Sequence, residues 1–368
     1  MTGLGDRLDG KRVVIVAGSG GVGKTTASAA LALGMAAAGQ RVAVVTIDPA
    51  RRLAEALGLV ELGNEPRQVD PALLEGHGVE MAGELWAMML DPKATFDDLI
   101  VKLSPDASTR EDVLGNRIYG QLSNAIAGSQ EFSAVAKLYE ISREERFDVI
   151  VLDTPPSRNA LDFLDAPDRL IDFFEGKALK LFLVPTGIAA RVMSKGTGVV
   201  FAILKRLTGV DLLDDVAQLF RSLGGLIDGF RERATAVKAL LADPATTFFI
   251  VTSPEREPVA EAIFFHGKLR EARMAFGGLI VNRAIVADPS LGDPEAVRAA
   301  LGGSLGDALA AKVAGSVADL QLLADRDAES IERLKEQLDE PEPIVVPRLD
   351  GEVQDIDGLL ALYRHLAA

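Results

Sequence analysis

A glycine-rich loop between an apolar run and a helical pattern is the feature that most constrains this chain. The sequence reads VVIVAGSGGVGKTT from Val13, and Gly18, Gly23, Lys24 and Thr25 satisfy the pattern G-x-x-x-x-G-K-[ST]. Glycines let backbone N–H groups converge on phosphate oxygens, and the following helix adds partial positive charge at its N-terminus. The expected nucleotide-binding residues of this loop are Gly18, Ser19, Gly20, Gly21, Val22, Gly23, Lys24, Thr25 and Thr26.

Two carboxylates that follow apolar runs are expected to complete the site. We expect Lys24 to act catalytically at the β- and γ-phosphates and Thr25 to ligate Mg²⁺. The segment FDVIVLD ends at Asp153, which we expect to bind the same Mg²⁺ through water. The segment VAVVTID ends at Asp48, which could orient or deprotonate the attacking water or act as an outer metal residue. We favour water positioning for Asp48.

Apolar runs alternate with helical patterns, which predicts an α/β fold of the P-loop NTPase type, with a mostly parallel sheet covered by helices. The predicted strands are Val13–Ala17, Val42–Ile47, Leu85–Leu90, Val149–Leu152, Thr247–Thr252, Leu279–Val281 and Ile344–Val346. Predicted helices include Lys24–Ala38, Glu255–Met274 and a solvated helix from Arg326 that ends at a proline.

Two stretches interrupt the alternation and read as helix after helix. They span residues 92–146 and 167–244, and in the second one apolar residues recur every three to four positions between Leu212 and Phe230. We expect them to form an inserted helical subdomain. The ATPase core is then expected to comprise residues 1–91, 147–166 and 245–368.

Composition restricts the class of partner. The 368-residue chain has a formal net charge of −15, which does not favour a basic surface for nucleic acid or an anionic membrane. It contains no cysteine, so disulfides and thiolate metal sites are excluded. No run reaches the roughly 18 apolar residues of a spanning helix, and the N-terminus lacks a signal peptide's apolar region. We therefore expect a cytoplasmic protein that is not itself transmembrane.

Three segments resemble the P-loop, switch I and switch II of the ArsA ATPase family: GSGGVGKTT, TIDPARRLAEALG and LDTPPSRNALDFLDAP. That family includes the arsenite-pump ATPase and the ATPase that delivers tail-anchored membrane proteins in the GET pathway, and the resemblance is closest to bacterial members with one P-loop. GLIVNR is similar to the family segment whose asparagine, here Asn282, recognises adenine. VPRLDGEV resembles the adenine-side loop and contains Pro347. The resemblance implies a nucleotide-gated dimer that hydrolyses ATP with Mg²⁺.

One position departs from the family. ArsA proteins usually carry a lysine that crosses the dimer interface where this chain has Ser19, and a hydroxyl cannot stabilise phosphate charge as an ammonium does. Either a lysine-bearing homologue pairs with this chain in a heterodimer, or an arginine of a homodimer substitutes. The candidate arginines are Arg51, Arg52 and Arg158. Switch II also reads Arg158-Asn159 where the family often has Gly-His.

The expected function is an ATPase that couples its nucleotide state to binding or delivery of a hydrophobic helix or membrane-protein client. The alternative is a regulatory subunit that binds ATP and completes the active site of a lysine-bearing partner. Arsenite binding and a zinc-clasped dimer are disfavoured because both need thiolates. A partitioning ATPase is disfavoured by the helical insertion. The apolar stretch Gly187–Phe220 could line a client groove or pack into a helical core.

Overall fold

The computed structural model describes residues 4–47, 51–122, 129–154, 165–169, 171–172, 210–287, 292–340, 342–349, 351, 353 and 355–367. Three predicted functional positions, Asp48, Arg158 and Asn159, lie outside these ranges, as does most of the apolar stretch 187–220.

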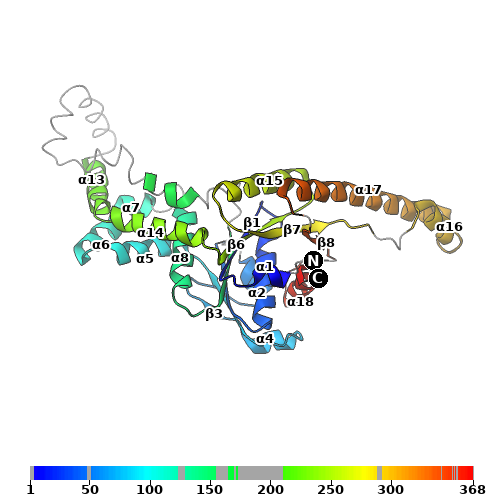
Figure 1. The fold of residues 1–368 in the computed structure, drawn as a ribbon, viewed down its shortest axis with the longest axis horizontal. Coiled ribbons are helices and arrows are strands. Elements are labelled where there is room, and N and C mark those ends of the chain that lie inside the picture. The colour runs from blue at the N-terminus through cyan, green and yellow to red at the C-terminus, as the bar shows by residue number, and fades with distance from the viewer. Residues whose placement is uncertain are drawn as a thin grey trace, which may run out of the picture.

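The described residues form one eight-stranded sheet at the centre of the molecule (Figure 1). In sheet order the strands are β3 (Arg67–Gln68), β4 (Glu84–Met89), β2 (Arg41–Thr46), β5 (Val149–Asp153), β1 (Val13–Ala17), β6 (Thr246–Thr252), β7 (Phe276–Ala284) and β8 (Ile344–Pro347). All neighbouring pairs are parallel except β3 with β4. The α/β fold and all seven predicted strands are confirmed. The edge strand β3 was missed because it consists of two exposed polar residues with no apolar run.

The strand register brings the predicted site residues to one edge of the sheet. Asp153, the last residue of β5, is in register with Val16 of β1 and with Thr46 of β2. The glycine-rich loop leaves β1 at this same carboxyl edge. Parallel sheets bind ligands outside the carboxyl ends of their strands, so the topology itself places the loop and Asp153 together.

Helices cover both faces of the sheet because alternate strand residues point to opposite sides. Val14 and Val16 face one core with α2 (Lys24–Ala37) and α18 (Ile356–Ala367). Val13 and Ile15 face the other core, which also contains residues of α8, α14, α15 and α17. The bounds of α8, α14 and α15 are Ser129–Ser142, Ile227–Leu241 and Arg256–Glu271. Three short helices complete the core region: α1 (Leu4–Leu8), α3 (Arg52–Ala56) and α4 (Pro71–Gly76).

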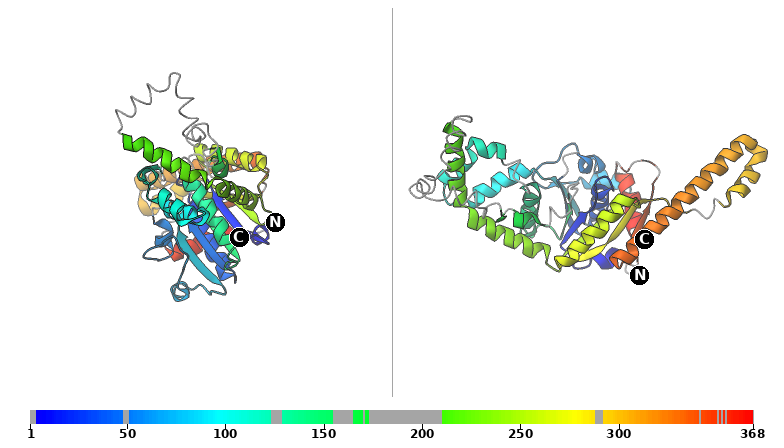
Figure 2. Two further views of the ribbon diagram at one scale, coloured as in Figure 1. Left: turned by 90° about the vertical axis from the view of Figure 1, so that its left-hand side faces the viewer. Right: turned by 90° about the horizontal axis from the view of Figure 1, so that it is seen from above.

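A separate apolar cluster lies among helices at one end of the molecule (Figures 1 and 2). Besides α8 and α14, it is built from α5 (Pro92–Leu103), α6 (Ala107–Leu114), α7 (Arg117–Leu122) and α13 (Val210–Gly224). Phe96 and Phe230 stack at its centre with their ring centroids 5.6 Å apart. Asp91 and Asp106 cap α5 and α6 by accepting hydrogen bonds from backbone N–H groups. These helices share one apolar cluster, and the inserted helical subdomain with its boundaries stays a prediction.

A long helical hairpin projects from the opposite end (Figure 2). It consists of α16 (Pro294–Leu305) and α17 (Asp307–Leu338). The helix predicted from Arg326 is confirmed, and most of its residues are exposed or half-buried, but it begins further upstream than predicted and three of its residues are buried. It is the second half of a 32-residue helix, and Asp327, Leu334 and Leu338 are buried there. Among the described residues, no helix is both long enough and apolar enough to cross a bilayer.

Candidate active site

The glycine-rich loop needs two of its glycines for contacts with neighbouring strands. A Cβ atom on Gly18 would lie 2.0 Å from the carbonyl oxygen of Val251 on β6. A Cβ atom on Gly23 would lie 2.4 Å from the side-chain nitrogen of Asn282. Both glycines also have positive φ angles, +151° and +96°, which side chains disfavour. The loop therefore adopts this path only because both positions are glycine.

The side chains of Lys24 and Ser19 are both buried, and each is hydrogen-bonded within the protein. The Lys24 ammonium donates a hydrogen bond to the backbone carbonyl of Ser19 at 2.8 Å, which closes the loop on itself. The Ser19 hydroxyl donates a hydrogen bond to the carboxylate of Glu261 on α15. The side chain at the family's lysine position is thus engaged within its own chain.

Thr25 and Asp153 lie together at the carboxyl edge of the sheet. The Thr25 hydroxyl donates to the Asp153 carboxylate at 2.7 Å, and the Thr46 hydroxyl donates to the same oxygen at 2.8 Å. Asp153 is 1% exposed, so its charge is held by these donors in a nearly dry position. A hydroxyl beside a carboxylate is an oxygen donor set that fits Mg²⁺ completed by phosphate and water oxygens. Within the described ranges, no group of three or more His, Asp or Glu side chains could hold a metal ion.

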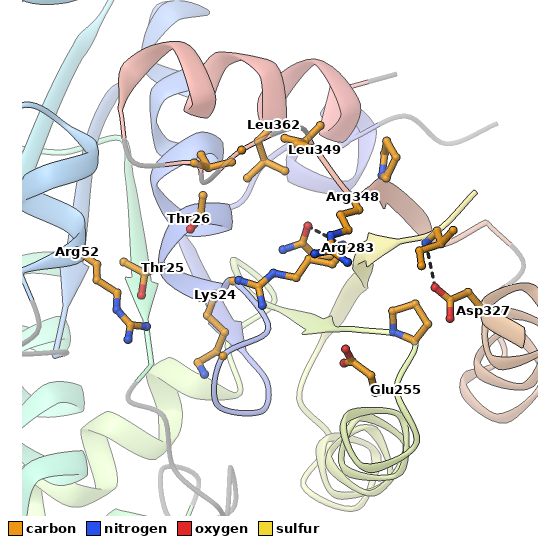
Figure 3. A pocket seen from close by; sticks show the side chains of 18 of the residues that line it. Lys24, Thr25, Thr26, Arg52, Glu255, Arg283, Asp327, Arg348, Leu349 and Leu362 are labelled. Carbon is orange, nitrogen blue, oxygen red and sulfur yellow. Dashed lines mark hydrogen bonds between the residues drawn. The ribbon is translucent and has the colours of Figure 1, made fainter. Parts of the chain in front are cut away.

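Lys24 and Thr25 line a cavity of about 1170 Å³ whose walls also include residues between positions 323 and 327 of α17, whereas Asp153 lies behind Thr25 and does not line it. Its lining includes Gly21, Gly23, Lys24, Thr25, Thr26, Arg52, Glu55, Thr154, Glu255, Asn282, Arg283, Leu323, Arg326, Asp327, Pro347, Arg348 and Leu362. Figure 3 shows basic side chains entering it from opposite sides, Arg52 from α3 and Arg283 and Arg348 from the ends of β7 and β8. Among the described residues, five basic side chains and three acidic ones line this cavity, so the described part of its wall is positively charged in an acidic protein.

The predicted binding residues divide into two groups. Gly21, Gly23, Lys24, Thr25, Thr26, Asn282 and Pro347 line the cavity. Gly18, Ser19, Gly20 and Val22 are not among its lining residues. Gly18 packs against β6 and the Ser19 side chain is bonded to α15, so these two residues support the loop on the side away from the cavity.

Asn282, predicted to recognise adenine, holds the loop in this structure. Its side-chain nitrogen donates to the Val22 carbonyl at 2.9 Å, and its side-chain oxygen accepts from the Arg283 N–H. Arg283 has a φ of +60°, an uncommon backbone conformation for a residue other than glycine. The end of β7 is therefore fastened to the loop at the mouth of the cavity.

Sequence reasoning missed the wall contributed by α17. Asp327 is 2% exposed. It accepts a hydrogen bond from the Ile285 N–H at 2.9 Å and forms an ion pair with Arg326 at 2.8 Å. The hydrogen bond from Ile285 attaches α17 to the chain that follows β7, whereas the ion pair joins neighbouring residues of α17. No local motif marks them, whereas Arg283 and Arg348 could have been found as the neighbours of Asn282 and Pro347.

The two adjacent arginines proposed as lysine substitutes lie in different places. Arg52 lines the large cavity with Lys24 and Thr25. Arg51, with a φ of +56°, lines a separate small cavity that includes Leu62 and Met89. Arg51 is the N-cap residue of α3, and its left-handed backbone conformation lies at the point where the two side chains diverge.

A family model and several known proteins are similar to this chain, and they point to the same family of ATPases. A family model described as anion-transporting ATPase, ArsA_ATPase, matches residues 11–299. An uncharacterized protein of Streptomyces coelicolor is 30% identical over 244 residues, which is 66% of this chain and 55% of that protein. ATPase get3 of Aspergillus terreus is 33% identical over 162 residues, 43% of this chain and 44% of that protein. ATPase ASNA1 homolog 1 of Paramecium tetraurelia is 23% identical over 347 residues, 94% of this chain and 89% of that protein.

The extent of these matches differs among the relatives. The chain spans about half the length of the Streptomyces and Aspergillus proteins, at 55% and 44%, but most of the Paramecium protein. The family-model match begins before the glycine-rich loop and extends beyond Asn282 and Arg283. It therefore includes the loop, Asp153 and the end of β7.

Proposed function

The chain belongs to the ArsA family of anion-transporting ATPases, and on that premise we propose that it is a Mg²⁺-dependent ATP hydrolase. The nucleotide site is the cavity around Lys24. The observation that carries this proposal is that the phosphate loop lines a cavity rich in basic side chains, and that Thr25 of this lining is hydrogen-bonded to Asp153 behind it. A chain with a net charge of −15 that gathers five basic side chains there is suited to a polyphosphate ligand.

We assign each residue of the site a role in this reaction. Backbone N–H groups of the loop and the N-terminus of α2 bind the phosphates, and Lys24 leaves the Ser19 carbonyl to contact the β- and γ-phosphates. Thr25 and Asp153 would hold Mg²⁺, Thr25 through its hydroxyl and Asp153 through its carboxylate. When bound, Mg²⁺ neutralises charge that develops on the β- and γ-phosphate oxygens. Asn282 and Pro347 contact the adenine end. Asp48, outside the described residues, positions the attacking water.

The test is phosphate release from ATP as a function of Mg²⁺, with two aspartates at opposite ends of β5 compared. Asp153→Asn should lower turnover by about 100-fold or more, since the carboxylate is needed for the metal. Asp148→Asn is the matched control, because Asp148 is exposed and pairs with Arg41 at 2.6 Å on the far edge. Equal effects of the two substitutions, or Mg²⁺-independent turnover of the Asp153 variant, would refute the metal assignment.

We further propose a cytoplasmic, nucleotide-gated dimer that binds a hydrophobic helix or membrane-protein client. The resemblance to the ArsA family and a helical end with its own apolar cluster support this proposal. The apolar stretch predicted to line a client groove lies mostly outside the described residues. Mass measurement with ADP and with an ADP–metal-fluoride complex tests the dimer. A monomer in both states would contradict it.

The competing function is a regulatory subunit that binds ATP and completes a lysine-bearing partner's site. Ser19, whose hydroxyl is bonded to Glu261, favours it, because a loop without a cation at this position is expected to bind ATP but to hydrolyse it slowly. The two functions differ in one measurement: robust turnover by the isolated chain supports the hydrolase, and tight ATP binding without turnover supports the regulatory subunit.

A further inference from the structure

We propose that Arg52 is a catalytic residue that acts in cis, contacting the terminal phosphate of ATP held by the same chain. This inference rests on the proposed ATPase function. In the hydrolysis step a water oxygen bonds to the γ-phosphorus while the bond to the bridging oxygen breaks. ADP leaves with that electron pair, and a water proton passes to phosphate or solvent. Negative charge on the phosphate oxygens is stabilised by cations placed around them.

Arg52 lies beyond the carboxyl edge of the sheet, on the side of Thr25 and Asp153. β2 ends at Thr46, whose hydroxyl binds Asp153, and α3 begins at Arg52 beyond this same edge of the sheet. Arg52 lines the cavity together with Lys24 and Thr25. In Figure 3 its side chain extends from α3 toward the side of the cavity where Thr25 lies. It therefore enters from the Thr25–Asp153 side, whereas Arg283 and Arg348 enter from the opposite side.

The charge of the Arg52 guanidinium is available to a ligand. Within the part of the chain that the structure describes, the Arg52 guanidinium makes no hydrogen bond or ion pair. Arg326 differs, because its guanidinium pairs with Asp327 at 2.8 Å. A planar guanidinium binds phosphate oxygens through two parallel N–H groups and keeps its charge at every physiological pH. Arg52 is exposed, and it is thus a cation on the Thr25–Asp153 side of the cavity that is available to an anionic ligand.

The phosphate loop creates the need for this cation. Its second residue is Ser19, and the Ser19 hydroxyl is turned away to Glu261. The loop itself therefore supplies one ammonium group, that of Lys24. Arg51 does not fill the gap, because it lines the separate small cavity beside Leu62. The two adjacent arginines form a matched pair that differs in which cavity the side chain lines.

The experiment compares Arg52→Ala, Arg52→Lys and Arg51→Ala in the full chain. For each, we measure ATP turnover and the affinities for Mg²⁺–ADP and for Mg²⁺–ADP–aluminium fluoride, which mimics the transferring phosphate. Arg52→Ala should lower both turnover and the fluoride-complex affinity by about 100-fold and change ADP affinity by less than about threefold. Arg52→Lys should recover part of both losses. Arg51→Ala should match the wild type in all three.

A mixing experiment tests whether Arg52 acts within its own chain. Arg52→Ala chains are mixed with Lys24→Ala chains, so that each active site of a mixed dimer lacks one cation of its own chain. If Arg52 acts in cis, mixing restores no turnover. Recovery on mixing would show that the arginine crosses to a partner's site, and would overturn the inference.

Two other outcomes would also overturn it, and they are distinguishable from a failure of the proposed function. Wild-type turnover by Arg52→Ala, with unchanged fluoride-complex affinity, refutes the role of Arg52 alone. Loss of ADP affinity equal to the loss of fluoride-complex affinity assigns Arg52 to ground-state binding. Absence of ATP turnover in the wild-type chain refutes the hydrolase itself, and with it this inference.

Discussion

The Ser19 hydroxyl donates a hydrogen bond to the carboxylate of Glu261, which ties the phosphate loop to α15 across 242 positions of sequence. Ser19 is 7% exposed, and its own backbone carbonyl accepts a hydrogen bond from the Lys24 ammonium. One residue therefore links the P-loop lysine to a helix on the face of the sheet. The Ser19–Glu261 hydrogen bond therefore helps to position the loop, in addition to the glycines of the loop.

Removal of this contact should be measurable as a loss of stability. Ser19→Ala removes a hydrogen bond to a charged, partly buried group, so we expect the free energy of unfolding to fall by about 1–2 kcal/mol in urea titrations. Ser316→Ala on α17 is the control, because the Ser316 side chain is exposed and bonds only its own helix. Equal midpoints for the two variants would contradict the assigned contact.

The attachment of α17 to the cavity depends on Asp327. Asp327→Ala leaves the Ile285 N–H without its acceptor and Arg326 without its ion-pair partner, so we expect a loss of about 2–3 kcal/mol in unfolding free energy. Asp327→Asn retains an acceptor and should lose less. Asp325→Ala, exposed on the same helix, should stay within about 0.5 kcal/mol of the wild type. A harmless Asp327→Ala would mean that α17 is held by its apolar contacts alone.

The helical cluster depends on buried aromatic packing. Phe230 is 1% exposed and stacks on Phe96, so Phe230→Ala should reduce the unfolding free energy by about 3–5 kcal/mol. Phe264→Ala on α15 provides the comparison, because Phe264 is 56% exposed and its removal should cost about 0.5 kcal/mol or less. If thermal unfolding showed similar shifts for both, the described cluster would not be a packed core.

His266 should make stability depend on pH. Burial lowers the pKa of His266, and the nearby charge of Arg270 lowers it further, so the folded state disfavours the protonated ring. The unfolded chain then binds the proton more tightly. Stability is unaffected above the unfolded pKa of about 6.5 and falls as the pH drops below it. Urea unfolding at pH 7.5 and 5.5 should show a larger loss for the wild type than for His266→Gln or His266→Phe. Identical losses in all three would rule out this origin.

The sequence by itself determined the α/β class, the seven longer strands and the phosphate loop, because each of these is local. A buried parallel strand is a short apolar run, and the loop needs its glycines at fixed spacing before a helix. The Thr25–Asp153 pair was also predictable, since Asp153 ends one parallel strand and Thr25 follows the loop that leaves another at the same sheet edge.

Only the tertiary structure decided which side chains share the cavity. Ser19 meets Glu261, and α17 forms a wall near Arg283, through contacts between segments far apart in the chain that no local pattern records. Arg51 and Arg52 are identical in residue type and adjacent in sequence, yet they line different cavities. Their separation depends on the backbone conformation at the start of α3 and on what packs around it, which are properties of the folded chain.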